Sequence, residues 1–233
     1  MAIHLDDHLV TTTMRTPGHD FELAAGFCFT EGLLVGASVR TCRYCGTGPA
    51  ADTDFNVVSV DTGGLAPVPE PRLGTTTSSC GLCGSTSLDA LADRLEPLAP
   101  DVTFGADVLA GVAERVRAEQ QLFDATGAVH AAAAFDVAGT PLVVREDVGR
   151  HNAVDKVVGR LLLDDRLPAD ELGLYVSGRA SFEMVQKAWA AGFVALVAVS
   201  APTSLAVATA ARANLVLAGF VRGDRMNLYA GTV

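Results

Sequence analysis

The sequence predicts an α/β protein in which a C-terminal mixed sheet, with helices packed on it, follows a smaller N-terminal α+β region. Three observations predict this class. From Leu172 onward, apolar residues alternate between strand-like and helix-like spacing, an order typical of strands joined by helices. A strand-turn-strand pattern precedes them over 128–144. The stretch 61–79 is rich in Gly, Pro, Ser and Thr and predicts a linker, so we place the two regions at 1–78 and 79–233.

The C-terminal elements follow from the periodicity of apolar residues. Two strands, 128–137 and 140–144, flank the Ala138-Gly139 turn and predict a hairpin. A helix is predicted over 149–163. Strand, helix, strand, helix and strand then follow at 172–176, 181–191, 193–199, 204–213 and 215–221. This alternation favours parallel strands with helices packed against them.

Fewer signals define the elements before residue 128. The Pro17-Gly18 turn predicts the start of a helix over 19–34. Two more helices are predicted at 87–95 and 106–122, and the second carries Leu109, Val112 and Val116 on one face.

Composition excludes several classes of function. The net charge of -10 and a pI near 4.8 argue against sequence-independent binding of nucleic acid, which depends on Lys and Arg neutralising phosphates. The N-terminus lacks the basic start and apolar run of a secretory signal, which predicts a cytoplasmic protein. The longest apolar stretch, 188–201, is too short to span a bilayer, so we expect no membrane segment.

Three short polar loops follow the predicted strands at 177–181, 200–204 and 221–225. Ligands of such sheets bind beyond the carboxyl ends of the strands, where helix N-termini offer free amides to anions. Arg179, Arg222 and Arg225 would suit a phosphate-bearing ligand, because a guanidinium group makes forked hydrogen bonds to phosphate. The alternative is that these are ordinary turns with solvated arginines.

A second polar stretch, 145–159, covers the end of a strand and the start of a helix. It places Glu146, Asp147, Arg150 and His151 at the turn between them, where a binding site is expected. Surface helices are also rich in charge, so an ordinary solvated helix is the alternative.

Five cysteines are an odd number in a chain too large to need disulfide bonds, and a cytoplasmic setting keeps most thiols reduced, so cysteine pairs are expected to be catalytic or metal-binding. Cys80 and Cys83 form a CxxC pair with a glycine after each cysteine, which indicates a catalytic thiol, a redox dithiol or half of a zinc site. Cys42 and Cys45 form another CxxC pair, and four thiolates can bind zinc. The gap between the pairs exceeds the usual spacing of about 15 to 20 residues. Cys28 lies in an apolar helix and is expected to be buried.

The strings CGLCG, REDVGRHNAVDK, GRASFEMVQK and SAPTSLAV occur in this order, and with them the chain resembles the FdhD family of formate dehydrogenase accessory sulfurtransferases. The resemblance implies a sulfur carrier that receives persulfide sulfur from a cysteine desulfurase. It further implies transfer to the bis-molybdopterin guanine dinucleotide cofactor before that cofactor enters formate dehydrogenase. A C-terminal fold similar to cytidine deaminases and a homodimer are also implied.

Site residues are carried over from the same resemblance. Cys80 is expected to bear the persulfide, and Cys83 to lower its pKa or take part in relay. The family's cofactor-binding segment, which would take the guanine nucleotide moiety, falls on Phe220, Val221, Arg222, Gly223, Asp224 and Arg225. We add Arg179 and His151 as further cofactor-binding residues, and expect no bound metal.

A deaminase is the rival enzyme class, and a zinc-binding structural module is the alternative outside enzymes. Zinc deaminases need H-x-E followed later by P-C-x-x-C. His130 is followed by Ala132 where the glutamate would stand, and the CxxC pair precedes the histidine. The sequence therefore argues against deamination.

Overall fold

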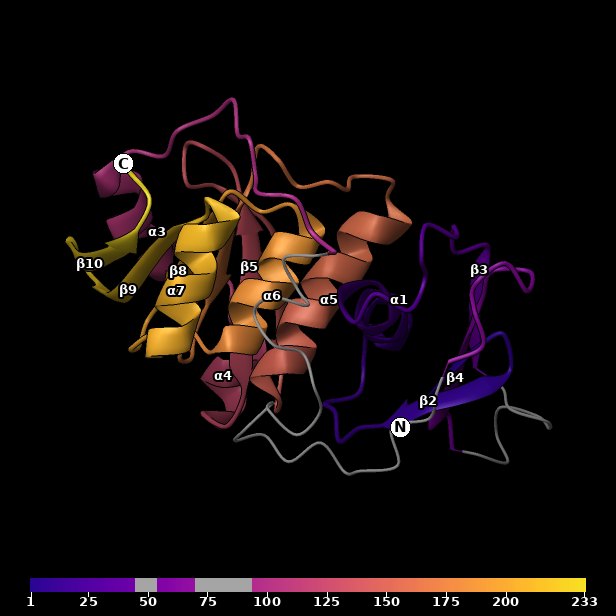
Figure 1. Ribbon diagram of the computed structural model, residues 1–233. Coiled ribbons are helices and arrows are strands. Elements are labelled where there is room, and N and C mark those ends of the chain that lie inside the picture. Colours follow the sequence, from indigo (N-terminus) through magenta and orange to yellow (C-terminus); the bar gives the residue numbers. More distant parts are fainter. Residues whose placement is uncertain (45–53, 70–93) are drawn as a thin grey trace.

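The computed structural model describes residues 1–44, 54–69 and 94–233. Two sheets, each mixed in strand direction, organise these residues (Figure 1). The α/β class predicted from the sequence is confirmed. The boundary predicted at 78/79, most of the linker and nearly all of the helix predicted at 87–95 lie outside the described residues, so the two-region division stays a prediction.

The first sheet has four strands in the order β2-β1-β4-β3. They are β1 (Ala2–Leu5), β2 (His8–Thr12), β3 (Thr41–Tyr44) and β4 (Val57–Asp61). Strand β1 pairs antiparallel with β2 and parallel with β4. Helix α1 (Asp20–Thr30) packs on this sheet, and Ala24 and Cys28 contribute to the shared core. The helix ends four residues before the predicted Leu34, and Gly32 adopts a positive φ of 71° just beyond it.

The second sheet has six strands in the order β10-β9-β8-β7-β5-β6. They are β5 (His130–Phe135), β6 (Pro141–Asp147), β7 (Gly173–Val176), β8 (Ala195–Ala198), β9 (Val216–Arg222) and β10 (Arg225–Ala230). Strands β7, β8 and β9 are parallel, while β5 runs antiparallel to both β6 and β7. The predicted hairpin and the alternating run are thus confirmed.

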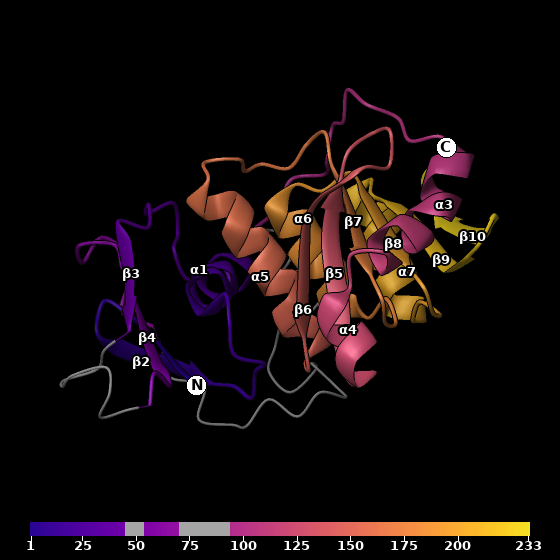
Figure 2. The same cartoon turned by 180° about the vertical axis from the view of Figure 1, so that it is seen from behind.

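Helices cover both faces of this second sheet. Helices α5 (Arg150–Leu163), α6 (Phe182–Ala191) and α7 (Ser204–Ala213) lie together on one face (Figure 1). Helix α3 (Ala106–Arg117) covers part of the other face, as the view from behind shows (Figure 2). Two buried clusters result, one on each side of the sheet.

The single helix predicted over 106–122 is confirmed up to Arg117 and wrong beyond it. The chain leaves α3 after Arg117 and begins a separate short helix, α4 (Gln121–Thr126). Gln120 lies between them with a non-helical ψ of 75°. The carboxylate of Glu146 accepts hydrogen bonds from the first amides of α4, at Leu122 and Phe123, both at 2.8 Å. A tertiary contact therefore starts a new helix where local periodicity would have continued the old one.

The two sheets are connected by a very close crossing of α1 over α5. Helix α1 lies between the four-stranded sheet and α5 in both opposite views (Figures 1 and 2). A Cβ atom at Gly26 would overlap the carbonyl oxygen of Asp155, and one at Gly159 would overlap the carbonyl oxygen of Glu22. Each glycine thus lets the backbone of its helix touch the backbone of the other.

A buried ionic cluster lies beside this crossing and includes the third helix, α6. The Lys187 ammonium donates hydrogen bonds to Asp155 at 2.9 Å, to Glu31 at 3.1 Å and to the Thr30 hydroxyl at 2.9 Å. Lys187 and Asp155 are almost completely buried. Because a buried charge is costly without its partners, this cluster fixes how α1, α5 and α6 pack.

Replacing either crossing glycine should therefore destabilise the fold. We expect Gly26→Ala and Gly159→Ala each to lower the free energy of unfolding by about 2–3 kcal/mol or more, because the added methyl group meets backbone that cannot rotate away. Urea unfolding followed by circular dichroism measures the change. The control is Gly111→Ala in α3, where a Cβ atom has open space, and its stability should stay equal or rise by up to about 1 kcal/mol. Equal stability of all three variants would contradict the close crossing.

Candidate functional site

The three loops predicted to form a site lie together at the carboxyl ends of β7, β8 and β9. The amide of Ser200 donates to the carbonyl of Gly178 at 3.3 Å, and the amide of Thr203 donates to that of Ala180 at 3.0 Å. The amide of Phe220 in turn donates to the carbonyl of Ser200 at 3.2 Å. Backbone hydrogen bonds thus join the three segments into one continuous edge.

The third of these segments, 221–225, differs from the prediction. It is not an open loop after the last strand but the turn of a hairpin, because β10 follows and pairs antiparallel with β9. Gly223 has a positive φ of 62° at the first turn position, where glycine is favoured. Arg222 and Arg225 are partners across the turn, so their side chains leave the same face of the hairpin. The side chains of Arg225 and Asp224 are 90% and 97% exposed.

Phe220 is the unusual residue of this hairpin. Its φ of 52° places a bulky side chain in the left-handed region, at a cost of roughly 1–3 kcal/mol. The pairing of β9 with β10 is irregular at this point, and the Phe220 ring is left 49% exposed. The next residue, Val221, is only 1% exposed and packs in the core with α3. Of the predicted cofactor-binding residues, Val221 therefore offers only its backbone.

A cluster of basic side chains surrounds Gly178 on the loop after β7. A Cβ atom built on Gly178 would lie 3.3 Å from Cδ of Arg150 and 3.6 Å from the ring of His130, so both side chains pass directly over this glycine. Burial, and then the charge of Arg179, lowers the pKa of Arg150, while Glu183 raises it. The predicted residue Arg179 is thus brought together with Arg150.

His130 was not predicted as a site residue, because its sequence neighbours AAAA suggest only a buried strand. Strand β5 runs antiparallel to β7, which brings its first residue to the carboxyl end of β7. There, Nδ1 of His130 lies 3.3 Å from the Ser177 hydroxyl, and that hydroxyl accepts a hydrogen bond from the Ala131 amide at 2.9 Å. Burial, and then the charge of Arg150, lowers the pKa of His130.

His151, which was predicted to bind the cofactor, is only partly buried and lies within reach of the charges of Arg150 and Lys187. Burial, followed by the charges of Lys187 and Arg150, lowers its pKa to about 4. The imidazole is therefore neutral at pH 7. It lies between the basic cluster at the sheet edge and the ionic cluster of Lys187, and so offers a hydrogen-bonding group rather than a charge.

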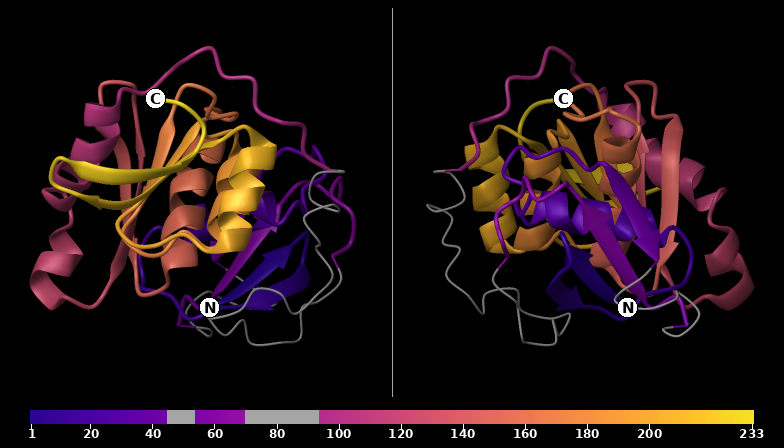
Figure 3. Two further views of the ribbon diagram at one scale, coloured as in Figure 1. Left: turned by 60° about the vertical axis from the view of Figure 1, so that its left-hand side comes forward. Right: turned by 90° about the vertical axis from the view of Figure 1, so that its right-hand side faces the viewer.

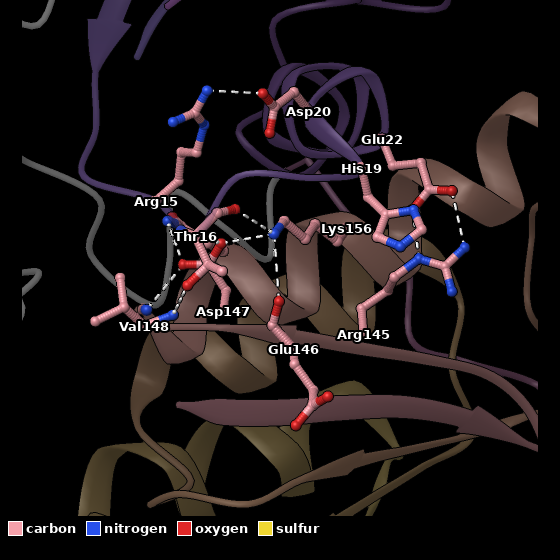
Figure 4. Close-up of polar contacts among 12 residues, drawn as sticks. Arg15, Thr16, His19, Asp20, Glu22, Arg145, Glu146, Asp147, Val148 and Lys156 are labelled. Carbon is pink, nitrogen blue, oxygen red and sulfur yellow. Dashed lines mark hydrogen bonds and ion pairs between the residues drawn. The ribbon is translucent and has the colours of Figure 1, made fainter. Parts of the chain in front are cut away.

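Several charged residues of the stretch 145–156 have partners inside the protein (Figure 4). Arg145 forms two hydrogen bonds with the Glu22 carboxylate of α1, the longer at 2.8 Å. Glu146 holds the start of α4, as described above. We expected Glu146 at a binding site, but its carboxylate stabilises a neighbouring helix.

Asp147 and Lys156 form a buried ion pair at 2.7 Å. Both also hold the segment that leads into α1: the Thr16 amide donates to Asp147 at 3.1 Å, and Lys156 donates to the Thr16 carbonyl at 3.0 Å (Figure 4). Asn152 donates to the Met14 carbonyl at 2.8 Å. This leaves Arg150 as the charged residue of this stretch that lies at the carboxyl edge, with His151 next to it in the chain.

The predicted thiols Cys80 and Cys83 lie outside the described residues, as does Cys45. Cys28 is fully buried, as predicted, and burial raises its pKa strongly. Burial raises the pKa of Cys42 to about 11. Both of these cysteines therefore remain protonated thiols at neutral pH, and neither is a nucleophilic thiolate. In the described parts of the chain, no three His, Cys, Asp or Glu residues are grouped as metal ligands.

Comparison with known proteins assigns the chain to a family. The model of the FdhD/NarQ family matches residues 1–233. The chain belongs to this family. A relative in Nocardia farcinica, named sulfur carrier protein FdhD, is 50% identical over 235 residues, which cover 99% of this chain and 84% of the relative. A relative of the same name in Streptomyces coelicolor is 49% identical over 239 residues, covering 99% and 85%.

A solved structure supports the same assignment. A proposed formate dehydrogenase accessory protein from Desulfotalea psychrophila is similar with a TM-score of 0.75 and 26% identity, covering 99% of this chain and 85% of that chain. The resemblance to the FdhD family stated from the sequence is thus confirmed, whereas the likeness of the C-terminal part to cytidine deaminases stays a prediction. In the ranges that the structure covers, no helix has the length and apolar character to cross a membrane.

The lowered pKa of His151 predicts a specific loss of stability in acid. Its pKa lies below the ordinary value of 6.5, so the unfolded chain takes up a proton first and stability falls as the pH decreases from 6.5 towards 4. The full difference corresponds to about 3 kcal/mol. We expect His151→Gln to remove this part of the pH dependence, as measured by urea unfolding between pH 7 and pH 4. His8→Gln, at an exposed position of β2, should keep the wild-type slope, and an unchanged slope in His151→Gln would refute the lowered pKa of His151.

Proposed function

We propose that this protein is the sulfur carrier of formate dehydrogenase maturation. It accepts sulfur from a cysteine desulfurase as a persulfide on Cys80 and transfers it to the bis-molybdopterin guanine dinucleotide cofactor, which then enters formate dehydrogenase. The observation that carries this proposal is the match of the FdhD/NarQ family model to the whole chain. Relatives that are 49% and 50% identical to it are named sulfur carrier proteins.

One turnover of the sulfur chemistry can be written with the donor persulfide and the two thiols of the CxxC pair. The Cys80 thiolate attacks the terminal sulfur of the donor persulfide, a new sulfur–sulfur bond forms, and the donor cysteine leaves as a thiolate. Release of that sulfur as hydrosulfide requires two electrons. The neighbouring thiol of Cys83 can supply them by attacking the inner sulfur of Cys80, which leaves a Cys80–Cys83 disulfide. The pair thus fits both steps of a carrier.

The carboxyl edge of the second sheet suits the nucleotide end of the cofactor, which is the substrate of the transfer. The exposed Phe220 ring offers a flat apolar face, and strained residues of this kind cluster at ligand sites. Arg222 and Arg225 leave one face of the hairpin, where they can pair with phosphate or guanine acceptors. Gly223 allows close approach of the backbone, and the Asp224 carboxylate can accept hydrogen bonds from guanine.

The protein would act in the cytoplasm as a homodimer, with a cysteine desulfurase and formate dehydrogenase as its partners. The partners and the homodimer are expected from the family resemblance, and the cytoplasmic location from the N-terminal sequence. The second candidate, a zinc-binding module built from the two cysteine pairs, gains no support from the relatives, whose names describe sulfur carriers.

The first test concerns the thiol. After incubation with a cysteine desulfurase and cysteine, the wild-type protein should gain the mass of one sulfur atom, and Cys80→Ala should not, because it lacks the accepting thiolate. The same variant should leave formate dehydrogenase inactive. Cys42→Ala is the matched control, since its thiol is partly buried with a raised pKa, and it should keep the adduct. A persulfide that persists in Cys80→Ala would exclude this role for Cys80.

The second test concerns the hairpin arginines. Binding of GDP, as a fragment of the cofactor, should weaken in Arg222→Ala and Arg225→Ala by about tenfold to a hundredfold, the usual effect of losing a charge-assisted hydrogen bond. Isothermal titration calorimetry measures the affinity. Arg43→Ala, on the first sheet, pairs with exposed Asp7 and serves as the control. Unchanged GDP affinity in both hairpin variants would place the nucleotide away from the hairpin.

A further inference from the structure

The basic cluster around Gly178 is separate from the arginines of the hairpin. We propose that His130, Arg150 and Arg179 form a subsite for the diphosphate of the bound nucleotide, and that His130 takes part as an imidazolium ion when the subsite is filled. This inference rests on the proposed function, in which a nucleotide binds at the carboxyl edge. It adds a residue, His130, and a pH dependence that the hairpin alone would not produce.

Geometry brings the three side chains to one place. Gly178 lies beneath Arg150 and His130, and a side chain there would contact both. The loop turns directly into Arg179, whose charge acts on Arg150. The His130 ring is oriented by the Ser177 hydroxyl, which is itself fixed by the Ala131 amide. In the imidazolium form both ring nitrogens are donors, so Nδ1–H can donate to the second lone pair of the Ser177 hydroxyl while Nε2–H points towards an anion.

Two helices begin at the same place and leave polar groups available. Helix α5 has 14 residues and α6 has 10, and neither has a side-chain hydrogen bond at its N-cap, which is Gly149 in one and Ser181 in the other. The Ser181 hydroxyl oxygen is buried and has no hydrogen-bond partner among the described residues. A buried polar atom without a partner at a helix N-terminus is a group that an anion can satisfy.

The local charge favours an anion with more than one negative charge. Arg150 on α5 is the charged group that acts on His130, and Arg179 on the loop after β7 and Glu183 at the start of α6 act in turn on Arg150. Asp147 lies opposite His130 in the strand register, but its carboxylate is held by Lys156. Two arginines therefore face one glutamate, and the free site disfavours an additional proton on His130. A bound diphosphate reverses this balance and raises the pKa of the imidazole.

The sign of the pH effect follows from linkage. Because the imidazolium form is favoured in the complex, affinity is highest below the pKa of free His130 and falls as the pH rises through the pKa of the liganded form. The pKa of His130 in the free protein lies below 6.5, so the fall in affinity begins below pH 6.5 and ends where the liganded imidazole loses its proton. GDP itself loses a phosphate proton near pH 6, in the opposite sense. The comparison of variant with wild type removes this contribution, since both bind the same ligand.

The experiment measures GDP affinity by calorimetry at pH 6 and pH 8. His130→Asn keeps a group that can bond Ser177 but cannot take up a proton. We expect it to bind GDP about tenfold more weakly than the wild type at pH 6 and less than about twofold more weakly at pH 8. His19→Asn is the matched control, a half-exposed histidine next to Glu22 at the start of α1 whose pKa is also lowered, and it should bind like the wild type at both pH values.

A second measurement does not depend on a variant that folds. In the wild-type protein, the His130 ring signal followed by NMR should titrate at a higher pH when inorganic pyrophosphate is present than when it is absent. A ratio of affinities that is equal at pH 6 and pH 8, or a His130 titration that pyrophosphate leaves unchanged, would overturn the subsite. Either result can coexist with a persulfide on Cys80 and with GDP binding at the hairpin, so it leaves the proposed function standing. Loss of the Cys80 adduct or of all GDP binding would instead contradict the proposed function itself.

Discussion

The contact of α1 with α5, backbone against backbone, is the constraint on which the other parts of the structure depend. Gly26 and Gly159 allow each helix to reach the peptide groups of the other. Helix α1 packs on the first sheet and α5 packs on β5 and β6, so the two helices together lie between the two sheets. Its first turn carries Arg150 and His151. The position of the basic cluster at the sheet edge is therefore set by a crossing that involves no ligand-binding residue.

Around that crossing, charged side chains act mainly as structural partners. Asp155 binds Lys187, Asp147 binds Lys156, and Arg145 binds Glu22, so that residues of α1, α5 and α6 and the end of β6 are held by buried or partly buried ion pairs. Removing one member of a buried pair leaves the other charge without compensation. A dense run of charge such as 145–156 can therefore result mainly from packing, while Arg150 lies at the carboxyl edge.

The periodicity of apolar residues was sufficient to predict the helices and strands whose packing partners lie close in the chain. Strands β7, β8 and β9 and helices α5, α6 and α7 all form within a residue or two of their predicted ends, because their apolar faces meet one continuous core. The break between α3 and α4 depends on Glu146, which is distant in sequence. In strand β10, exposed and buried side chains do not alternate clearly, since the neighbours Asn227 and Leu228 are both exposed. The role of His130 at the edge depends on antiparallel pairing with β7, which no local pattern encodes. The thiols of the CxxC pair lie outside the described residues, so for them the sequence remains the source of the prediction.

The basic cluster at the edge also belongs to a protein with a net charge of -10. An approaching anion therefore meets two opposing fields: repulsion from the whole molecule at long range, and attraction from Arg150 and Arg179 close to the surface. Dissolved salt screens the first more than the second, because the Debye length is about 10 Å at 0.1 M. Moderate ionic strength should thus speed the encounter of an anionic ligand with this edge. The association rate and the affinity of an anionic ligand will then respond to salt in different ways. The ionic strength inside a cell will therefore affect which anions reach this edge.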